Sequence, residues 1–189
     1  MSTTETRTET QYEEQIENAF QLYLKKMKDY GTSWRVLRGK SITDQIFIKT
    51  QRIRSIQEAG EQKVQDPLKD EFVGIVNYCI MGLIQINPEN ANLSLELTQD
   101  QAISLYNEQR KIIYELMLKK NHDYGEAWRE MRISSLVDLI LMKLLRIKSI
   151  EDNAGKVIAS EGIDAGYQDI VNYSIFALIR ISEGEDPMK

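Results

Sequence analysis

The sequence predicts an all-α protein that contains a tandem duplication of one three-helix unit. The motif Lys-Lys-x-x-Asp-Tyr-Gly-x-x-Trp-Arg occurs twice, at residues 25–35 and at residues 119–129. Apolar residues recur at steps of three and four, as at Ile113, Leu116 and Met117, which is the spacing of one face of an α-helix. Since no segment shows the strict apolar–polar alternation of a half-buried β-strand, we predict no strands.

The two copies align over most of their length. Residues 12–58 match residues 106–152 without a gap, and close to half of the positions are identical. After a shift of one residue, residues 74–86 match residues 169–181 at more than half of the positions. Such agreement indicates a duplication. We divide the chain into a disordered lead (1–10), a first repeat with a degenerate site (11–87), a linker (88–97), a second repeat (98–183) and a tail (184–189).

Each repeat is predicted to contain three helices in the same order. They cover residues 12–28, 42–59 and 70–86 in the first repeat and residues 102–122, 136–154 and 165–181 in the second. Thr98 and Gln101 are spaced as a capping box, and Gly60 and Gly155 are expected to end the second helices. The third helix is apolar almost all round, which is typical of a buried helix. We therefore expect the repeats to pack as a pseudo-twofold helical bundle.

Composition excludes several classes of function. The net charge is −5 and no basic run stands out, so the chain lacks the surface that duplex nucleic acid requires. The single cysteine, Cys79, lies in an apolar run and is expected to be buried, as in a cytoplasmic protein. The polar start is not expected to act as a signal peptide, and no apolar run is long enough to span a membrane.

The repeated Asp-Tyr-Gly block has two interpretations. Lysines in the last turn and a glycine after it are typical of a helix C-terminus, with the tryptophan pinning the following loop to the core. This explanation does not cover Asp29 and Asp123, because a carboxylate beside a helix C-terminus is unfavourable. The functional interpretation makes the block part of a nucleotide site, in which Tyr124 or Trp128 stacks on a base.

The second and third helices carry the remaining shared polar residues. Asp138, Lys143 and Arg146 could line one face, either as a structural ion-pair network or as an anion clamp. On the third helix, Asp169 and Asn172 share a face, and Asn172 could also be a satisfied core amide. A buried carboxylate needs a partner, for which Arg146 and a divalent ion are the alternatives.

The copies differ in their carboxylates. Asp169, Asp164 and Glu115 correspond to Gly74, Lys69 and Gln21, so the second repeat keeps the better set for a metal. A composite site, with acids from one copy and bases from the other, is the alternative. His122 is expected to be a solvated helix-end residue.

Two sets of site residues follow, and no catalytic residue is assigned. The predicted nucleotide-binding residues are Lys119, Asp123, Tyr124, Trp128, Lys143, Arg146, Asn172, Lys49 and Arg52. The predicted Mg²⁺ ligands are Glu115, Asp138, Glu161, Asp164 and Asp169, because Mg²⁺ prefers oxygen ligands.

These motifs resemble a known family. The segment "KKNHDYGEAW", followed by Asp138, Lys143, Arg146 and the Asp-x-x-Asn-Tyr of residues 169–173, is similar to the nucleotide modification associated domain 1 proteins. More loosely, the pattern is similar to the MazG-like all-α NTP pyrophosphatases, which hold Mg²⁺ and hydrolyse a nucleoside triphosphate to a monophosphate. The chain departs from that group because it has Asn172 where the group has Asp.

The resemblance implies a protein of nucleotide metabolism, with Mg²⁺-dependent pyrophosphohydrolase-like binding or hydrolysis of a nucleotide or another phosphate-bearing small molecule. The alternative is a non-catalytic helical interaction or scaffold module, in which the shared polar residues form ion pairs and caps. In either case we expect no membrane partner, and we expect a homodimer.

Overall fold

The computed structural model describes residues 6–158 and 161–189, which form α-helices and short 3₁₀ helices without a strand. The α-helices are α1 (Arg7–Tyr30), α2 (Gly39–Ala59), α3 (Leu68–Ile86), α4 (Gln99–Tyr124), α5 (Ile133–Asp152) and α6 (Ile163–Ser182). The 3₁₀ helices are η1 (Ser33–Val36), η2 (Pro88–Asn90) and η3 (Ala127–Glu130). The predicted all-α class is confirmed. No helix in these two ranges has the length and apolar character needed to cross a bilayer.

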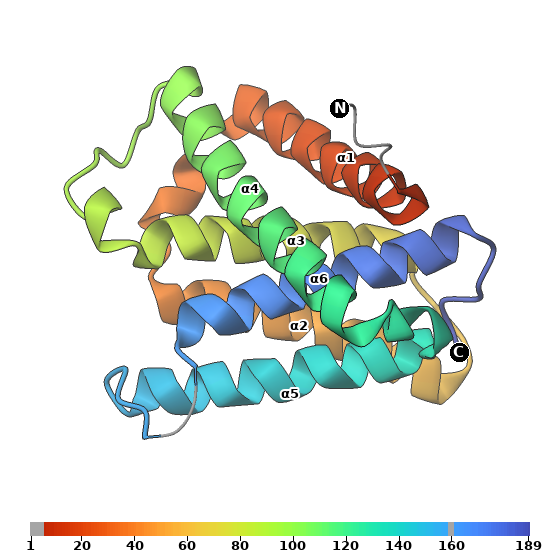
Figure 1. The fold of residues 1–189 in the computed structure, drawn as a ribbon. Helices are drawn as coiled ribbons and strands as arrows, with labels where there is room; N and C mark the ends of the chain where they lie inside the picture. Colours follow the sequence, from red (N-terminus) through yellow and green to blue (C-terminus); the bar gives the residue numbers. More distant parts are fainter. Residues whose placement is uncertain (1–5, 159–160) are drawn as a thin grey trace.

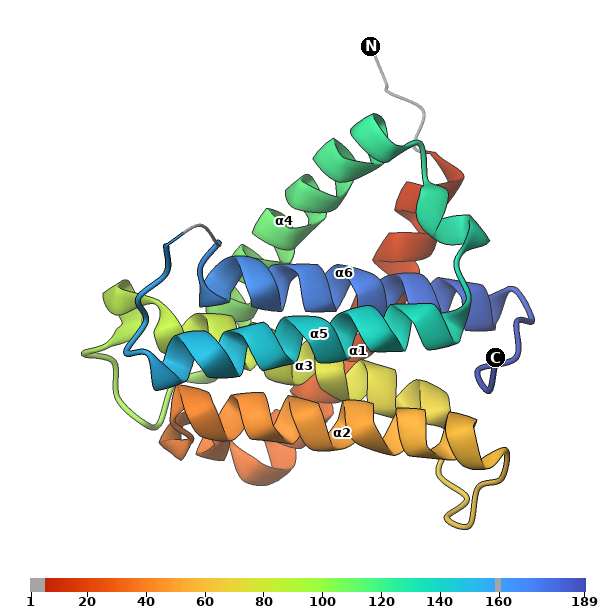
Figure 2. The same ribbon diagram turned by 90° about the horizontal axis from the view of Figure 1, so that it is seen from below.

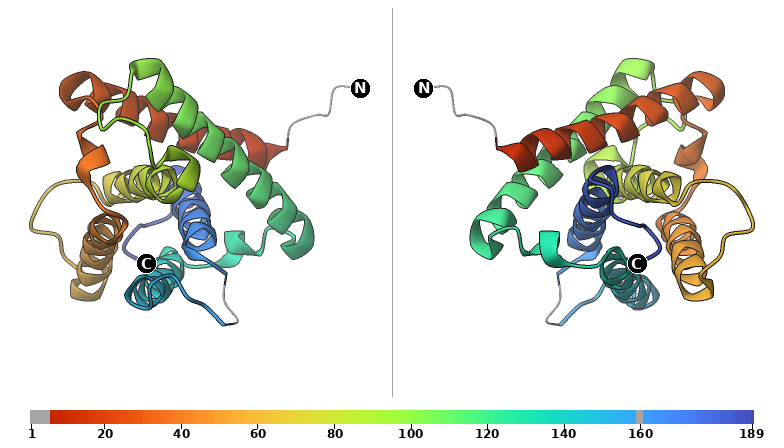
Figure 3. Two further views of the ribbon diagram at one scale, coloured as in Figure 1. Left: turned by 90° about the vertical axis from the view of Figure 1, so that its left-hand side faces the viewer. Right: turned by 90° about the vertical axis from the view of Figure 1, so that its right-hand side faces the viewer.

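The helices form three layers (Figure 1). The antiparallel pair α3 and α6 lies in the middle, and the antiparallel pair α2 and α5 packs against one side of it (Figure 2). On the other side, α1 and α4 cross over α3 and α6, as the end-on views show (Figure 3). Each layer thus pairs a helix of the first repeat with its counterpart in the second, which is the predicted pseudo-twofold arrangement.

The middle layer is close-packed because its helices are apolar on most sides. Ile75 and Ile80 of α3, like Ile170 and Ile175 of α6, are inaccessible to solvent. α3 approaches α6 closely at Gly82, where a Cβ atom would lie 2.9 Å from Cε2 of Tyr167.

Two equivalent hydrogen bonds join the layer of α1 and α4 to the middle layer of α3 and α6. Tyr12 of α1 donates to Oδ1 of Asn172 on α6 at 2.8 Å, and Tyr106 of α4 donates to Oδ1 of Asn77 on α3 at 2.7 Å. The first helix of each repeat therefore reaches across to the third helix of the other repeat. Since all four side chains are buried, these bonds help to fix the angle at which the layers cross.

The helix ends partly agree with the predictions. The capping box at Thr98 and Gln101 is confirmed, and Gly60 ends α2 in the left-handed conformation. The predicted disordered lead is wrong from Arg7 onward, because Thr6 and Glu9 form a second capping box and start α1 there. Residues 1–5 of that lead lie outside the described residues. α5 ends at Asp152 rather than at residue 154. Cys79 is fully buried, as predicted.

Candidate functional site

A pocket of about 270 Å³ lies in the second repeat, between the end of α4, η3, α5 and α6, and we call it the α4–α6 pocket. Its polar lining consists of Lys120, Asn121, Tyr124, Trp128, Asp169, Asn172 and Tyr173. Its remaining lining consists of Met117, Ala127, Met131, Leu139 and Phe176. The repeated block and the Asp-x-x-Asn-Tyr motif, which are far apart in sequence, therefore meet at one cavity.

Two aromatic residues of the repeated block take different positions at the pocket. Phe176 stacks on Trp128 with ring centroids 4.3 Å apart and an interplanar angle of 3°, and the guanidinium carbon of Arg129 lies 4.4 Å from the ring centroid of Trp128. Because both groups pack against its ring, Trp128 offers less ring surface than Tyr124 for the predicted stacking on a base. Tyr124 is 73% exposed and keeps an open ring at the rim.

Asp169 is buried and lies between two lysines. Its Oδ1 is 2.5 Å from Lys120 Nζ, and its Oδ2 is 2.7 Å from Lys143 Nζ. Burial acts to lower the pKa of Lys120, but the hydrogen bond and charge of Asp169 outweigh it, so the pKa is raised. Burial, and then the charge of Asp169, raises the pKa of the nearby Tyr173 phenol. The predicted partner Arg146 is wrong, because the lysines take its place.

Two buried donors at the pocket have no hydrogen-bond partner among the described residues. One is Nδ2 of Asn172, whose side-chain oxygen already accepts from Tyr12, and the other is Nε1 of Trp128. Asn172 is 4% exposed and Trp128 is 6% exposed, so bulk water does not satisfy either group. A buried unsatisfied donor costs about 1–3 kcal/mol, and such groups in native proteins require an explanation. A ligand that brings acceptors into the pocket would supply one.

A second cavity adjoins the first, and we call it the basic hollow. It measures about 410 Å³ and is lined by Lys143, Arg146, Ile147, Ile150, Glu161, Gly162 and Gly166. Arg146 is exposed and forms no ion pair or hydrogen bond with any residue in the described ranges. Because Lys143 lines the hollow while its ion-pair partner Asp169 lines the α4–α6 pocket, this pair lies between the two cavities.

The first repeat has a larger buried side chain where the second repeat has Met117 of the pocket lining. Tyr23, which corresponds to Met117, is buried, with its ring 6.5 Å from that of Trp34. Burial raises the pKa of the Tyr23 phenol to about 12, although the Trp34 N–H acts to lower it without forming a well-aligned hydrogen bond. Asn77 is also satisfied, because its Nδ2 donates to the carbonyl of Ala19 at 3.0 Å.

The cations of the first repeat are also engaged. A Cβ atom at Gly74, which corresponds to Asp169, would lie 2.9 Å from Cε of Lys49, so the lysine occupies the place of the missing side chain. Glu71, one helical turn earlier, lies 3.4 Å from Lys49 and 2.6 Å from Arg52. Lys49 and Arg52 were predicted to bind nucleotide, but in the structure both form ion pairs with Glu71.

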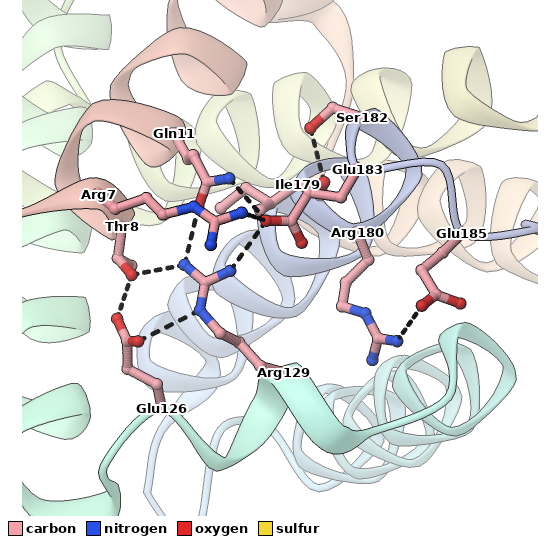
Figure 4. A network of polar contacts seen from close by, with 10 residues as sticks. All are labelled: Arg7, Thr8, Gln11, Glu126, Arg129, Ile179, Arg180, Ser182, Glu183 and Glu185. Carbon is pink, nitrogen blue, oxygen red and sulfur yellow. Dashed lines mark hydrogen bonds and ion pairs between the residues drawn. The ribbon is translucent and has the colours of Figure 1, made fainter.

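The repeated arginine holds the loop that carries Trp128 (Figure 4). Arg129 donates to Thr8 Oγ1 at 2.6 Å, to Gln11 Oε1 at 2.8 Å and to Glu126 Oε2 at 3.2 Å, and it pairs with Glu183 at 3.4 Å. The start of α1, η3 and the end of α6 are thereby joined. Glu126 is held at a φ of 59°, in the left-handed region that non-glycine residues rarely adopt.

Arg35, the equivalent residue of the first repeat, has the matching role. It donates to the carbonyl of Leu93 at 3.2 Å in the segment that leads to α4. Each repeated arginine therefore secures the chain at the start of the other repeat's first helix, so this part of the motif is structural.

Asp138 forms a structural ion pair, and it lines a hollow together with Arg146 but without Lys143, so the predicted polar face of the three residues is found only in part. It lies 3.5 Å from Arg54 of α2, and the equivalent Asp44 lies 3.0 Å from Lys148 of α5. These two symmetric contacts explain why both copies keep the aspartate. They match the ion-pair interpretation of this position.

The other predicted residues are dispersed. Lys119, Asp123 and Glu115 are exposed and do not line the α4–α6 pocket. Asp164 is exposed and lines a separate hollow with Gln109.

The predicted carboxylate cluster is therefore not assembled. In the part of the chain that the structure describes, no three His, Cys, Asp or Glu side chains are placed to hold a metal ion. Asp169 is neutralised by lysines instead, and Glu161 lies across the basic hollow.

The predicted set of site residues omitted Lys120 and Tyr173, which line the pocket. The signal for Lys120 was present, because Tyr106, Ile113 and Met117 define the buried face of α4 and the next position on that face is Lys120, not Lys119. Tyr173 follows Asn172 and is half-buried.

Comparison with known protein families matches the chain to a family model. A protein family described as nucleotide modification associated domain 1 matches residues 26–86 and 120–181, which together make up well over half of the chain. The two segments coincide with the two repeats and agree with the duplication. Searches of curated proteins and of solved structures found no match.

Proposed function

The chain belongs to the nucleotide modification associated domain 1 family, and on this premise we propose that its α4–α6 pocket binds a nucleotide. The single observation that carries the proposal is the pair of unsatisfied buried donors, on Asn172 and Trp128, in a mostly apolar cavity. Ligand pockets commonly combine an apolar lining with a few convergent polar groups. A base is a flat, partly apolar molecule with acceptors at its edge, and Tyr124 at the rim offers it an open ring.

The phosphate would lie in the basic hollow. Arg146 has no partner among the residues that the structure describes, and guanidinium groups bind phosphate oxygens through paired hydrogen bonds. Lys143 is shared with Asp169, so it would act mainly through its charge. A nucleotide would thus span the two cavities, with its sugar beside the Asp169–Lys143 pair.

Mg²⁺-dependent pyrophosphohydrolase activity of the MazG-like kind is the second candidate. Glu161 favours it, because its charge contributes to raising the pKa of Lys120 and so acts on the same cluster as Asp169. Two dispersed carboxylates would hold Mg²⁺ weakly, so the ion would arrive bound to the phosphates of the substrate. Pyrophosphate release from deoxynucleoside triphosphates, with and without Mg²⁺, tests this candidate.

The alternative of a non-catalytic helical scaffold is supported by the ion pairs of Asp138, Asp44 and Glu71. These contacts lie outside the α4–α6 pocket, so both roles are compatible with them. We also propose the expected homodimer, which sedimentation at two protein concentrations tests. A scaffold would not bind nucleotides.

Calorimetric titration of the full chain with deoxynucleoside monophosphates and triphosphates tests the binding proposal. We expect one nucleotide per chain. Met117→Tyr copies the residue that fills the equivalent space in the first repeat, so the variant should fold and lose binding. Tyr23→Met is the matched control and should bind as the unchanged protein does. A Met117→Tyr protein that still binds nucleotides would contradict the assignment of the pocket.

A further inference from the structure

We infer that the α4–α6 pocket selects a base that carries a lactam group, the adjoining C=O and ring N–H of guanine, thymine and uracil. Adenine and cytosine carry an amino group beside an acceptor nitrogen instead. Asn172 would donate to the carbonyl and Asp169 would accept from the N–H. The inference rests on the proposed function and names the substrate class of the same site.

The direction of the Asn172 amide is fixed by its surroundings. Its Oδ1 accepts from Tyr12 at 2.8 Å, which leaves the N–H groups of Nδ2 for the pocket. The first repeat shows the same orientation independently, because Asn77 accepts from Tyr106 and donates its Nδ2 to a backbone carbonyl that can only accept. The Nδ2 of Asn172 is therefore a donor without a partner in the part of the chain that the structure describes.

Asp169 supplies the complementary acceptor. Each of its oxygens pairs with one lysine, at 2.5 Å and 2.7 Å. A carboxylate accepts about four hydrogen bonds in total, so lone pairs remain for a ligand. The two ammonium groups hold the carboxylate in place, and a carboxylate accepts hydrogen bonds without donating them.

The two side chains are spaced to act on one base edge. Asp169 and Asn172 are three residues apart on α6, which places them on the same face, roughly 5–6 Å apart at Cβ. A lactam presents an acceptor and a donor side by side and would satisfy both groups. An amino-substituted base could match the same pair only if it turned over, with its NH₂ toward Asp169 and its ring nitrogen toward Asn172, and a sugar held beside the Asp169–Lys143 pair opposes that orientation. In the orientation that a lactam adopts, its NH₂ would meet the Asn172 donor and its ring nitrogen the carboxylate, and each mismatch leaves a buried group unpaired.

The first repeat explains why the selection belongs to one half of the chain. Gly74 stands at the position of the acceptor Asp169, and Asn77 donates its Nδ2 hydrogen bond to the carbonyl of Ala19. Neither half of the donor–acceptor pair is therefore offered there.

The test compares four deoxynucleoside monophosphates by calorimetric titration of the unchanged full chain. We expect dGMP and dTMP to bind roughly 10- to 100-fold more tightly than dAMP and dCMP, the range expected from one or two unpaired buried groups. Equal affinities, or a preference for dAMP and dCMP, would overturn the inference while leaving nucleotide binding intact. If none of the four binds, the proposed function fails as well.

Two substitutions assign the preference to its residues. Asn172→Asp replaces the donor by an acceptor and should reduce or reverse the preference for dGMP and dTMP. Asp169→Asn replaces the fixed acceptor by an amide that can either donate or accept, and should reduce the preference at least several-fold. Glu71→Gln, which changes a carboxylate of the first repeat, is the control and should keep the preference. An unchanged preference in a folded Asp169→Asn protein would contradict the assigned roles.

Discussion

Arg52 and Arg146 occupy equivalent positions in the two repeats, and the structure predicts opposite consequences for their loss. Arg52 lies 2.6 Å from Glu71, and both side chains are mostly buried, at 26% and 14% exposed. Arg146 is exposed and has no partner in the described ranges. Arg52→Gln should therefore lower stability and spare nucleotide binding, whereas Arg146→Gln should spare stability and weaken nucleotide binding.

The size of each effect follows from the contacts. Glu71 keeps Lys49 at 3.4 Å after Arg52→Gln, so the free energy of unfolding should fall by about 1 kcal/mol rather than by the larger cost of isolating a buried charge. For a chain of this size, such a loss lowers the melting temperature by about 2–4 °C. Loss of a charge-assisted hydrogen bond to phosphate should weaken binding by roughly tenfold.

Urea unfolding measures the first effect, and calorimetric titration with a nucleoside monophosphate at low salt measures the second. Both assays are applied to both variants, so each protein is the other's control. The reasoning is refuted if Arg146→Gln loses stability while its nucleotide affinity is unchanged, or if Arg52→Gln weakens binding as much as Arg146→Gln does.

Three further predictions concern structural features. Arg129→Ala should destabilise the protein by about 2–3 kcal/mol and speed hydrogen exchange at the start of α1, because four contacts are lost. The control Arg7→Ala, at an exposed site, should change stability by less than about 0.5 kcal/mol. Equal hydrogen exchange in the two variants would count against the docking role of Arg129. Burial, more than any other cause, raises the pKa of Glu151. This carboxyl therefore favours the folded state most below its unfolded pKa, and that contribution is lost as the pH rises through its folded pKa. Glu151→Gln should flatten the dependence of the free energy of unfolding on pH above about pH 4.3, and an unaltered dependence would contradict this. Burial also raises the pKa of the Cys79 thiol, so a thiol reagent should label it only as fast as the protein unfolds, and rapid labelling of the native protein would show that the core is open.

The fold was predictable because its signals are local or repeated. Apolar spacing located all six helices, and the apolar character of residues 70–86 and 165–181 correctly placed them at the centre. The start of α1 was missed because the first ten residues are polar, and only the capping box of Thr6 and Glu9 marks where helix formation begins.

The site was harder to predict because it depends on contacts between distant segments. Asp169, Asn172 and Tyr124 were identified from the motifs, and the structure brings them to one pocket. The partners of Asp169 could not be deduced, since Lys120 and Lys143 come from two other helices.

The degenerate character of the first repeat was expected from Gly74, and it stays a prediction. The structure adds that Tyr23 is buried where the second repeat has Met117, and that Lys49 pairs with Glu71, a carboxylate that the second repeat replaces by Gly166. The two copies thus differ around the α4–α6 pocket and its counterpart. A comparison of polar residues shared by both copies could not detect this, because Tyr23 and Glu71 occur in only one of them.

A crystal structure of the full chain soaked with dGMP or dTMP tests the central claim most directly. The account predicts a base between α4 and α6, in contact with Asn172 and Asp169, and a phosphate near Arg146. Density for the nucleotide at the first repeat or at another surface, with the α4–α6 pocket empty, would contradict it.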